Sequence, residues 1–394
     1  MTTIEVDAAS FLVITLVALA AAWTVTMLGP RIAIPVVIVE VVLGIAIGPQ
    51  GLALAEADDF IDFFAHLGLG MLFFFAGYEI DLERIRGRPL RLAVLGWLLT
   101  LVLAYTAGGL LAWAGVVASL LYTGSAMSTT AIGTLIPILD DAGDLRTRFG
   151  THLLGAGAIG EFGPILLVTL VLSLHSPLHN AVILLAFVAV AVLAAQVVIR
   201  SGSAGWAHLE RTLESSNQLA VRATVALVFA LVALAAELGL DVLLGGFAAG
   251  LITRAAVGER EVTRFESKVV AVGYGFLVPF FFVVSGMRFD LDAVLADIGT
   301  MAEVPLFLAL FWLVRGLPAL LLYRAALDGR DRLALAFFSA TQLPLVVAIT
   351  TVAIDAGRMS SSTAAALVGA AILSTLIFPL AGLRLRSGRV ALDA

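Results

Sequence analysis

Apolar runs of about 20 residues recur from one end of this chain to the other, and each is long enough to cross a hydrocarbon core of about 30 Å. The 394-residue chain is 61% hydrophobic and 13% charged. A soluble domain carries about 25% charged residues. Within lipid the backbone polar groups must be satisfied inside the protein, which favours helices. The sequence therefore predicts an all-α polytopic protein of the cell (inner or plasma) membrane.

Hydropathy predicts about thirteen spans, with expected limits at 10–28, 33–49, 59–78, 89–114, 116–138, 149–174, 178–200, 218–238, 240–256, 268–287, 303–324, 332–354 and 361–382. The basic residues test this count. Twenty of the 23 Lys and Arg residues fall on one side of the membrane, only Arg288 and Arg358 fall on the other, and Arg315 lies inside a span. Cytoplasmic loops carry the excess of Lys and Arg. We therefore expect the N-terminus outside and the C-terminus in the cytoplasm.

Two segments of similar sequence indicate an internal repeat. One reads GYEIDL from Gly77 and the other GMRFDL from Gly286, which is an offset of 209 residues. An odd number of spans, seven, separates the two segments, so the copies would run in opposite directions, as the inverted repeats of secondary transporters do. The same offset aligns Thr130 with Ser339. Chance recurrence of Phe and Gly in an apolar sequence is the alternative.

Two spans carry a proline beside a run of polar side chains, and these are the candidate broken helices. Pro137 lies in the span at 116–138, and Pro344 lies in the span at 332–354. Proline removes a backbone donor, and carbonyls freed at membrane depth must find partners or line a wet cavity. The neighbouring polar side chains are Ser128, Thr129, Thr130, Thr341 and Gln342. Kinked helices whose hydroxyls bond back to their own backbone are the alternative.

Three charged side chains that lie well away from the span ends are singled out, namely Glu161, Arg315 and Glu40. Glu161 is the one Asp, Glu, Lys or Arg between residues 149 and 174. A carboxylate at mid-membrane costs roughly 2.5–3.5 kcal/mol on insertion scales, so it marks a functional site by default. Arg315 stays protonated and is expected to compensate Glu161, Glu40 or the ends of broken helices, or to form a structural ion pair. Glu40 either lines the ion path or is structural.

Several classes of function are disfavoured. The chain has no cysteine, which excludes disulfides and thiolate metal sites. No span pairs a nucleophile with a base at depth, so we expect no enzyme, no cofactor and no resident metal. No basic stretch is typical of nucleic-acid binding. The expected partners are a monovalent cation, the proton and the lipid bilayer.

The motifs together carry a family resemblance. In and just after the second span, a P-x-V-x-G-E-x-L-A-G-x-x-L-G-P-x-G signature is matched at Pro35, Glu40, Gly44, Gly48, Pro49 and Gly51. With GMLFFFAGYEIDLERIR and VPFFFVVSGMRFDL, the chain resembles the monovalent cation:proton antiporters, in the branch of Kef-type and bacterial Na⁺/H⁺ exchangers. The resemblance implies a homodimer of thirteen-span protomers that work by elevator-type alternating access, with two broken spans crossing at the ion site.

The resemblance also implies a division of the chain. Residues 1–88 would form N-terminal scaffold and dimerisation spans. Residues 89–174 would form the first core half with Glu161, and residues 175–300 a linker span with a second scaffold part. Residues 301–394 would form the second core half with Arg315. No nucleotide-sensing domain is expected after the last span.

The sequence departs from the family at three places of interest. The sixth span of the family usually carries Asp-Asp, Asn-Asp or Gln-Asp, where this chain has Gly160 and Glu161. Many members have a lysine at the position of Arg315, so proton release from that lysine cannot carry over. Residue 39 is Val39 where the signature has glycine.

These observations predict a secondary antiporter that exchanges Na⁺ or K⁺ for protons by competition at Glu161, with electroneutral 1:1 stoichiometry. The predicted cation shell is made by hydroxyls and carbonyls around Ser128, Thr129, Thr130 and Thr341, with Gln342 and Gly160 nearby. The alternative is a transporter of another class with the same inverted fold, in which Arg315 is the counter-charge for an organic anion.

Overall fold

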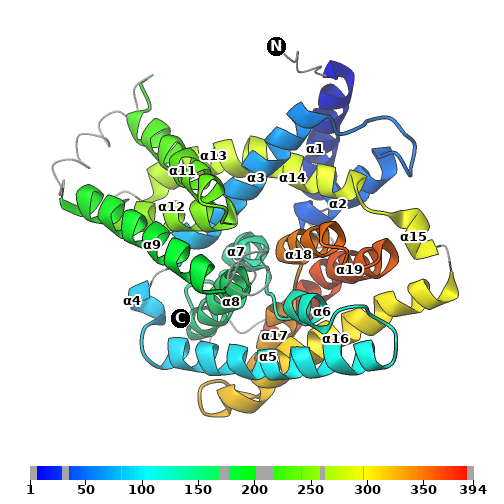
Figure 1. The fold of residues 1–394 in the computed structure, drawn as a ribbon. Coiled ribbons are helices and arrows are strands. Elements are labelled where there is room, and N and C mark those ends of the chain that lie inside the picture. Colours follow the sequence, from blue (N-terminus) through cyan, green and yellow to red (C-terminus); the bar gives the residue numbers. More distant parts are fainter. Residues whose placement is uncertain are drawn as a thin grey trace. The chain divides into compact units, whose positions relative to one another are not determined.

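The computed structural model describes residues 7–28, 35–80, 82–167, 177–200, 217–240, 242–257, 262–295 and 297–387. All the regular elements in these ranges are helices (Figure 1), which confirms the all-α prediction. Among the described residues, eight helices are long and apolar enough to cross a membrane. Three shorter apolar helices lie at Val36–Ile47, Ala181–Gln196 and Leu243–Val257. The count of thirteen spans stays a prediction, and four of the basic residues behind it lie outside the described ranges, namely Arg31, Arg211, Arg260 and Arg389.

The chain divides into two compact units. Unit 1 comprises Met1–Phe60, Leu82–Val168 and Phe282–Ala394, and unit 2 comprises Ile61–Asp81 and Thr169–Phe281. The predicted division at residues 88, 174 and 300 into scaffold and core parts is not tested by these units and stays a prediction.

Unit 2 is built on close helix crossings at glycines. Its helices are α3 (Asp59–Tyr78), α9 (Pro177–Arg200), α11 (Leu219–Glu237), α12 (Val242–Val257), α13 (Val262–Val272) and the π-helix η2 (Gly273–Leu277). A Cβ on Gly246 would collide with the carbonyl of Gly70, and one on Gly250 with the carbonyl of Phe74. Small residues at such points let membrane helices approach closely. Here α3 and α12 pack backbone against backbone.

Unit 1 contains the broken spans and the helices that surround them. Its continuous helices are α1 (Ala8–Leu28), α2 (Val36–Ile47), α4 (Leu82–Ile85), α5 (Arg88–Trp113), α8 (Arg148–Leu167), the end of α14 (Val278–Met287), α15 (Leu291–Leu295), α16 (Ile298–Leu322), the short η3 (Tyr323–Ala325) and α19 (Ser361–Arg386). The long helices α5 and α16 pack side by side, and α16 also packs on α19 (Figure 1).

Each predicted broken span is two helices joined by a short segment that is not helical. The first consists of α6 (Leu120–Met127) and α7 (Ile132–Asp141), and the second of α17 (Gly329–Ser339) and α18 (Pro344–Asp355). Breaks therefore fall at residues 128–131 and 340–343, which confirms that both spans are interrupted. Kinked continuous helices, the alternative, are not found.

The two breaks have different local causes. Pro344 is the first residue of α18. An N–H at this position would have no partner within the helix, so the missing N–H of proline costs no helical hydrogen bond. Pro137 lies inside α7 and not at the first break. There the hydroxyls of Ser128 and Thr129 donate to the carbonyls of Ser125 (2.8 Å) and Ala126 (3.1 Å). Side-chain bonds of this kind compete with helix continuation.

Candidate functional site

The two breaks meet each other and α8 through backbone hydrogen bonds. The amide of Ala131 donates to the carbonyl of Thr341 (2.8 Å), and the amide of Thr130 donates to the carbonyl of Gly160 (2.9 Å). The Gly160 carbonyl is available because its helical partner four residues later would be Pro164, which has no N–H. The proline in α8 thus provides an anchor for the first break.

Arg315 on α16 is buried, with 4% of its surface exposed, and it lies beside both breaks. Its Nε donates to Thr130 Oγ1 (2.9 Å) and to the Ser339 carbonyl (3.2 Å), and its Nη2 also donates to Thr130 Oγ1. Further bonds reach Thr100 Oγ1 from Nη1 (3.3 Å) and the Ala156 carbonyl from Nη2 (3.3 Å). Ser339 ends α17, so a fixed positive charge sits at a helix C-terminus, where the macrodipole favours it.

The partners of Arg315 are therefore hydroxyls and helix-end carbonyls. Among the described residues no carboxylate lies within ion-pair distance of its guanidinium. Of the compensation partners considered from sequence, the broken-helix end is the one in contact, and neither Glu161 nor Glu40 is.

Thr130 links the arginine to the second break. Its hydroxyl donates to the Ser339 carbonyl (2.6 Å) while accepting two bonds from Arg315. A hydroxyl oxygen has two lone pairs, and both are engaged here. In this arrangement Thr130 is part of the arginine network, and its predicted place in the cation shell stays a prediction.

Gly160 faces Arg315, while Glu161 faces elsewhere. A Cβ at position 160 would collide with Arg315 Nη2 and would lie 2.7 Å from Thr130 Oγ1. The guanidinium thus fills the space that a side chain at this position would need. The glycine that departs from the family pattern is the residue that admits the arginine.

Glu161 belongs to α8 and is 1% exposed. Its carboxylate lies at the N-terminus of α7. The backbone amides of Ile132 and Gly133, the first two residues of that helix, donate to its carboxylate. Helix N-termini present unpaired N–H groups and the positive end of the dipole, so they stabilise an anion. Its Oε2 atom is buried and has no hydrogen-bond partner among the described residues. One carboxylate oxygen is therefore uncommitted.

Gln342 fixes the second break to α19 and to α6. Gln342 lies in the break, outside both helices. Its backbone N–H donates to Ser374 Oγ (3.0 Å), and its backbone carbonyl accepts from the hydroxyls of Ser374 and Thr375 (both 3.0 Å). The side-chain Nε2 donates to the Met127 carbonyl at the end of α6 (3.1 Å). These bonds satisfy backbone groups that the break leaves without helical partners.

The remaining predicted site residues are buried around the breaks. The hydroxyl groups of Ser128, Thr129 and Thr341 each donate a proton to a carbonyl of the preceding turn. The lone pairs of these hydroxyl oxygens can still accept a hydrogen bond or bind a cation. Glu40 is buried on α2 and shares no hydrogen bond with the network in the described ranges. Within the same ranges no group of three or more His, Cys, Asp or Glu side chains could hold a metal.

Sequence reasoning missed several members of the network. Thr100, Ser374 and Thr375 are hydroxyl residues in long apolar helices, where such residues usually bond to their own backbone. They do so here, and in addition bind Arg315 or Gln342. No sequence signal separates the two uses.

Comparisons with known proteins agree with this architecture. The Bacillus subtilis protein YjbQ is 26% identical over 372 residues, which are 89% of this chain and 59% of YjbQ. The chain thus spans about three fifths of that relative. The Na⁺/H⁺-K⁺ antiporter GerN of Bacillus cereus is 26% identical over 275 residues, 68% of each protein.

A solved structure supports the fold. The sodium proton antiporter MjNhaP1 of Methanocaldococcus jannaschii superimposes with a TM-score of 0.61 over 98% of both chains, at 16% identity. The sequence profile described as sodium/hydrogen exchanger, transmembrane, matches residues 13–382. Because that match covers nearly the whole chain, this protein belongs to the sodium/hydrogen exchanger family, a family of multi-pass membrane transporters.

Proposed function

We propose that this protein is a secondary antiporter that exchanges a monovalent cation, Na⁺ or K⁺, for protons. The observation that carries the proposal is Glu161, a buried carboxylate that two helix amides hold while its Oε2 has no hydrogen-bond partner in the part of the chain that the structure describes. That oxygen takes either a proton or a cation. Since one group cannot hold both, the two fluxes are coupled.

Hard cations require several oxygen ligands, and the broken spans supply them. Ser128, Thr129 and Thr341 are buried at the breaks with oxygen lone pairs in reserve. We place the cation among these hydroxyls, neighbouring carbonyls and Glu161. Thr130 and Gly160 support the site through Arg315, and Gln342 holds the second break in place.

Arg315 supplies charge that does not change during the cycle. Its guanidinium remains protonated, and three of its nitrogens already donate to protein groups. One titrating carboxylate beside one fixed charge leads to electroneutral exchange of one cation for one proton.

The organic-anion alternative finds no support. An anion held by Arg315 would need donors from the guanidinium, whose three nitrogens each already donate to Thr130, Ser339, Thr100 or Ala156. The named relatives are Na⁺/H⁺ antiporters.

We further propose a homodimer in the plasma membrane, with the N-terminus outside and the C-terminus in the cytoplasm. The segregation of basic residues supports the orientation. The expected domain roles, with scaffold in residues 1–88 and 175–300 and core in residues 89–174 and 301–394, belong to this proposal.

The test is exchange by the purified protein in proteoliposomes. An imposed pH gradient should dissipate on addition of Na⁺ or K⁺ with wild-type protein. The Glu161→Gln variant keeps the side-chain volume and loses the titrating group, so its exchange should fall to the level of empty liposomes. Exchange at the wild-type rate in Glu161→Gln would remove this residue from the mechanism.

A further inference from the structure

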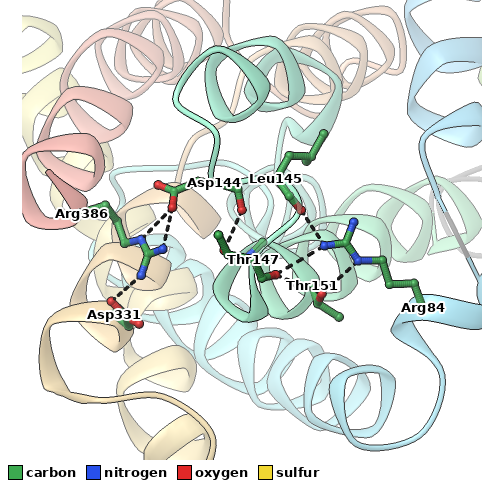
Figure 2. Close-up of polar contacts among 8 residues, drawn as sticks. Arg84, Asp144, Leu145, Thr147, Thr151, Asp331 and Arg386 are labelled. Atoms are coloured by element: carbon green, nitrogen blue, oxygen red, sulfur yellow. Dashed lines mark hydrogen bonds and ion pairs between the residues drawn. The ribbon is translucent and has the colours of Figure 1, made fainter. Parts of the chain in front are cut away.

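A second buried charge cluster lies in unit 1, separate from the Arg315 network. Arg386, in the last turn of α19, donates from Nε (3.1 Å) and Nη2 (2.5 Å) to Asp144 Oδ1 (Figure 2). Its Nη1 donates to Asp331 Oδ1 (2.9 Å). The side chains of Arg386 and Asp144 are each 1% exposed. One guanidinium therefore joins two carboxylates that are far apart in sequence.

The two carboxylates sit at the far ends of the two half-helices that build the candidate ion site. Asp144 lies in the turn after α7, whose first amides bind Glu161. Asp331 lies in the first turn of α17, whose last residue, Ser339, gives its carbonyl to Thr130 and Arg315. A helix of ten or eleven residues is about 15 Å long and stiff. A shift at one end of α7 or α17 is therefore transmitted to the site at the other end.

The turn between α7 and α8 is held from its other side as well. Arg84 on α4 donates from Nη2 to the Leu145 carbonyl (2.8 Å) and from Nε to Thr151 Oγ1 (3.0 Å). Figure 2 shows Arg84 and Arg386 on opposite sides of the turn, with Thr147 between them. Two arginines thus fix the end of α7.

The chemistry of the cluster favours a geometric role over a stabilising one. A buried ion pair contributes little net stability, because desolvation offsets the attraction, and its best-attested use is to specify one arrangement. The planar guanidinium can contact two carboxylates in fixed directions. It also lies over the ring of Phe149 at the start of α8, 4.4 Å from the ring centre. Position and orientation of the guanidinium are therefore both defined.

We propose that Arg386 is a positioning residue for transport: by binding Asp144 and Asp331 it sets the placement of α7 relative to α17, and so the geometry of the cation site. The inference rests on the proposed exchange function. It assigns Arg386 no contact with the transported ions.

The test measures the cation KM and the maximal rate separately in proteoliposomes. The main variant is the triple substitution Arg386→Met, Asp144→Asn, Asp331→Asn, which removes the three charges of the cluster together. Arg386→Lys is the conservative variant, because a lysine keeps the charge and loses the fork. Arg384→Gln removes an exposed arginine from the same helix turn and is the matched control.

The proposal expects the triple variant to raise the cation KM by roughly tenfold, the scale seen when groups that orient ligands are removed. Arg386→Lys should raise KM by less, and Arg384→Gln should leave it unchanged. A wild-type KM in the triple variant, with or without a lower maximal rate, overturns the proposal. Where the triple variant does not fold, a wild-type KM in Arg386→Lys overturns it in the same way. Absence of exchange in the wild type and in Arg384→Gln overturns the exchange function itself.

Discussion

Residue 160 shows how a missing side chain shapes the charge balance of the core. Members of the family usually carry an acidic or amide side chain before the carboxylate of this span, whereas here Gly160 leaves room for the Arg315 guanidinium. The arginine then binds Thr130 and the end of α17 without a carboxylate partner. Glycine at 160 and arginine at 315 are therefore a matched pair.

The first prediction concerns this pair. Gly160→Ala places a methyl group against Arg315 Nη2 and Thr130 Oγ1, so the arginine network must shift. Over-packing of this kind costs about 1–3 kcal/mol. The thermal unfolding midpoint of the purified variant should fall accordingly. Gly109→Ala on α5 is the control, because a Cβ there meets nothing within 4 Å, and an equal loss in both variants would show that the effect is not specific to the arginine pocket.

Glu161 and Arg315 could be selected from the sequence as candidate functional residues because each is a charged side chain in an apolar segment. A charged side chain at membrane depth is energetically costly. The sequence could not say which partner Arg315 takes. Its contacts with Thr100 and Ala156 depend on how α5 and α8 pack against α16, and that packing leaves no local pattern.

Among the elements, α16 is the helix that carries Arg315, and its first turn is capped by a titratable group. The Asp297 carboxylate accepts from Thr300 Oγ1 (2.7 Å) and from the Thr300 amide (2.9 Å). These bonds, the side-chain one foremost, hold the pKa of Asp297 below its ordinary value of 3.8. A lowered pKa means that the carboxylate form is favoured by folding.

The second prediction is a pH dependence at this cap. The stability contributed by Asp297 is fully present above its ordinary pKa of 3.8 and is lost as pH falls through the lowered value. Asp297→Ala should therefore lower the unfolding midpoint at pH 7, and the difference from wild type should shrink below pH 3.8. Asp297→Asn caps without titrating, so it should show a smaller loss with no such trend. A difference between Asp297→Ala and wild type that is constant with pH would contradict the assignment.

The broken helices could be predicted as elements, while the cause of the first break could not. Pro344 begins α18, but Pro137 continues α7 and the first break follows the hydroxyls of Ser128 and Thr129. Proline fixes the same backbone angle at every position. The presence of a proline in a span therefore does not predict at which residue the helix is interrupted.

Across the whole molecule, the orientation in the membrane rests on the basic residues, and the absence of native cysteine makes it testable. The third prediction uses two exposed arginines. Arg358 follows α18 and Arg330 lies in the first turn of α17, so they lie at opposite ends of the second broken span. In intact cells, Arg358→Cys should react with a membrane-impermeant thiol reagent, and Arg330→Cys should react only after permeabilisation. The reverse pattern would invert the topology.

The Arg386 cluster shows the limit of sequence reasoning at this scale. Arg386 and Asp331 are 55 residues apart, and Arg386 and Asp144 are 242 apart. Each sits near a span end, where solvated charges are ordinary. Only the packing of α17 and α19 with the turn after α7 removes them from water, and no periodicity in one segment reports that packing.

The most direct test of one carboxylate serving two ions in turn is the cation KM measured across pH in proteoliposomes. Competition at Glu161 predicts that the cation KM rises by about tenfold for each unit by which the pH falls, once protons occupy the site. The reason is that the carboxyl group must be deprotonated to bind a cation. The maximal rate at saturating cation should stay constant over the same range. A KM that does not change with pH, while the maximal rate falls, would contradict a shared site.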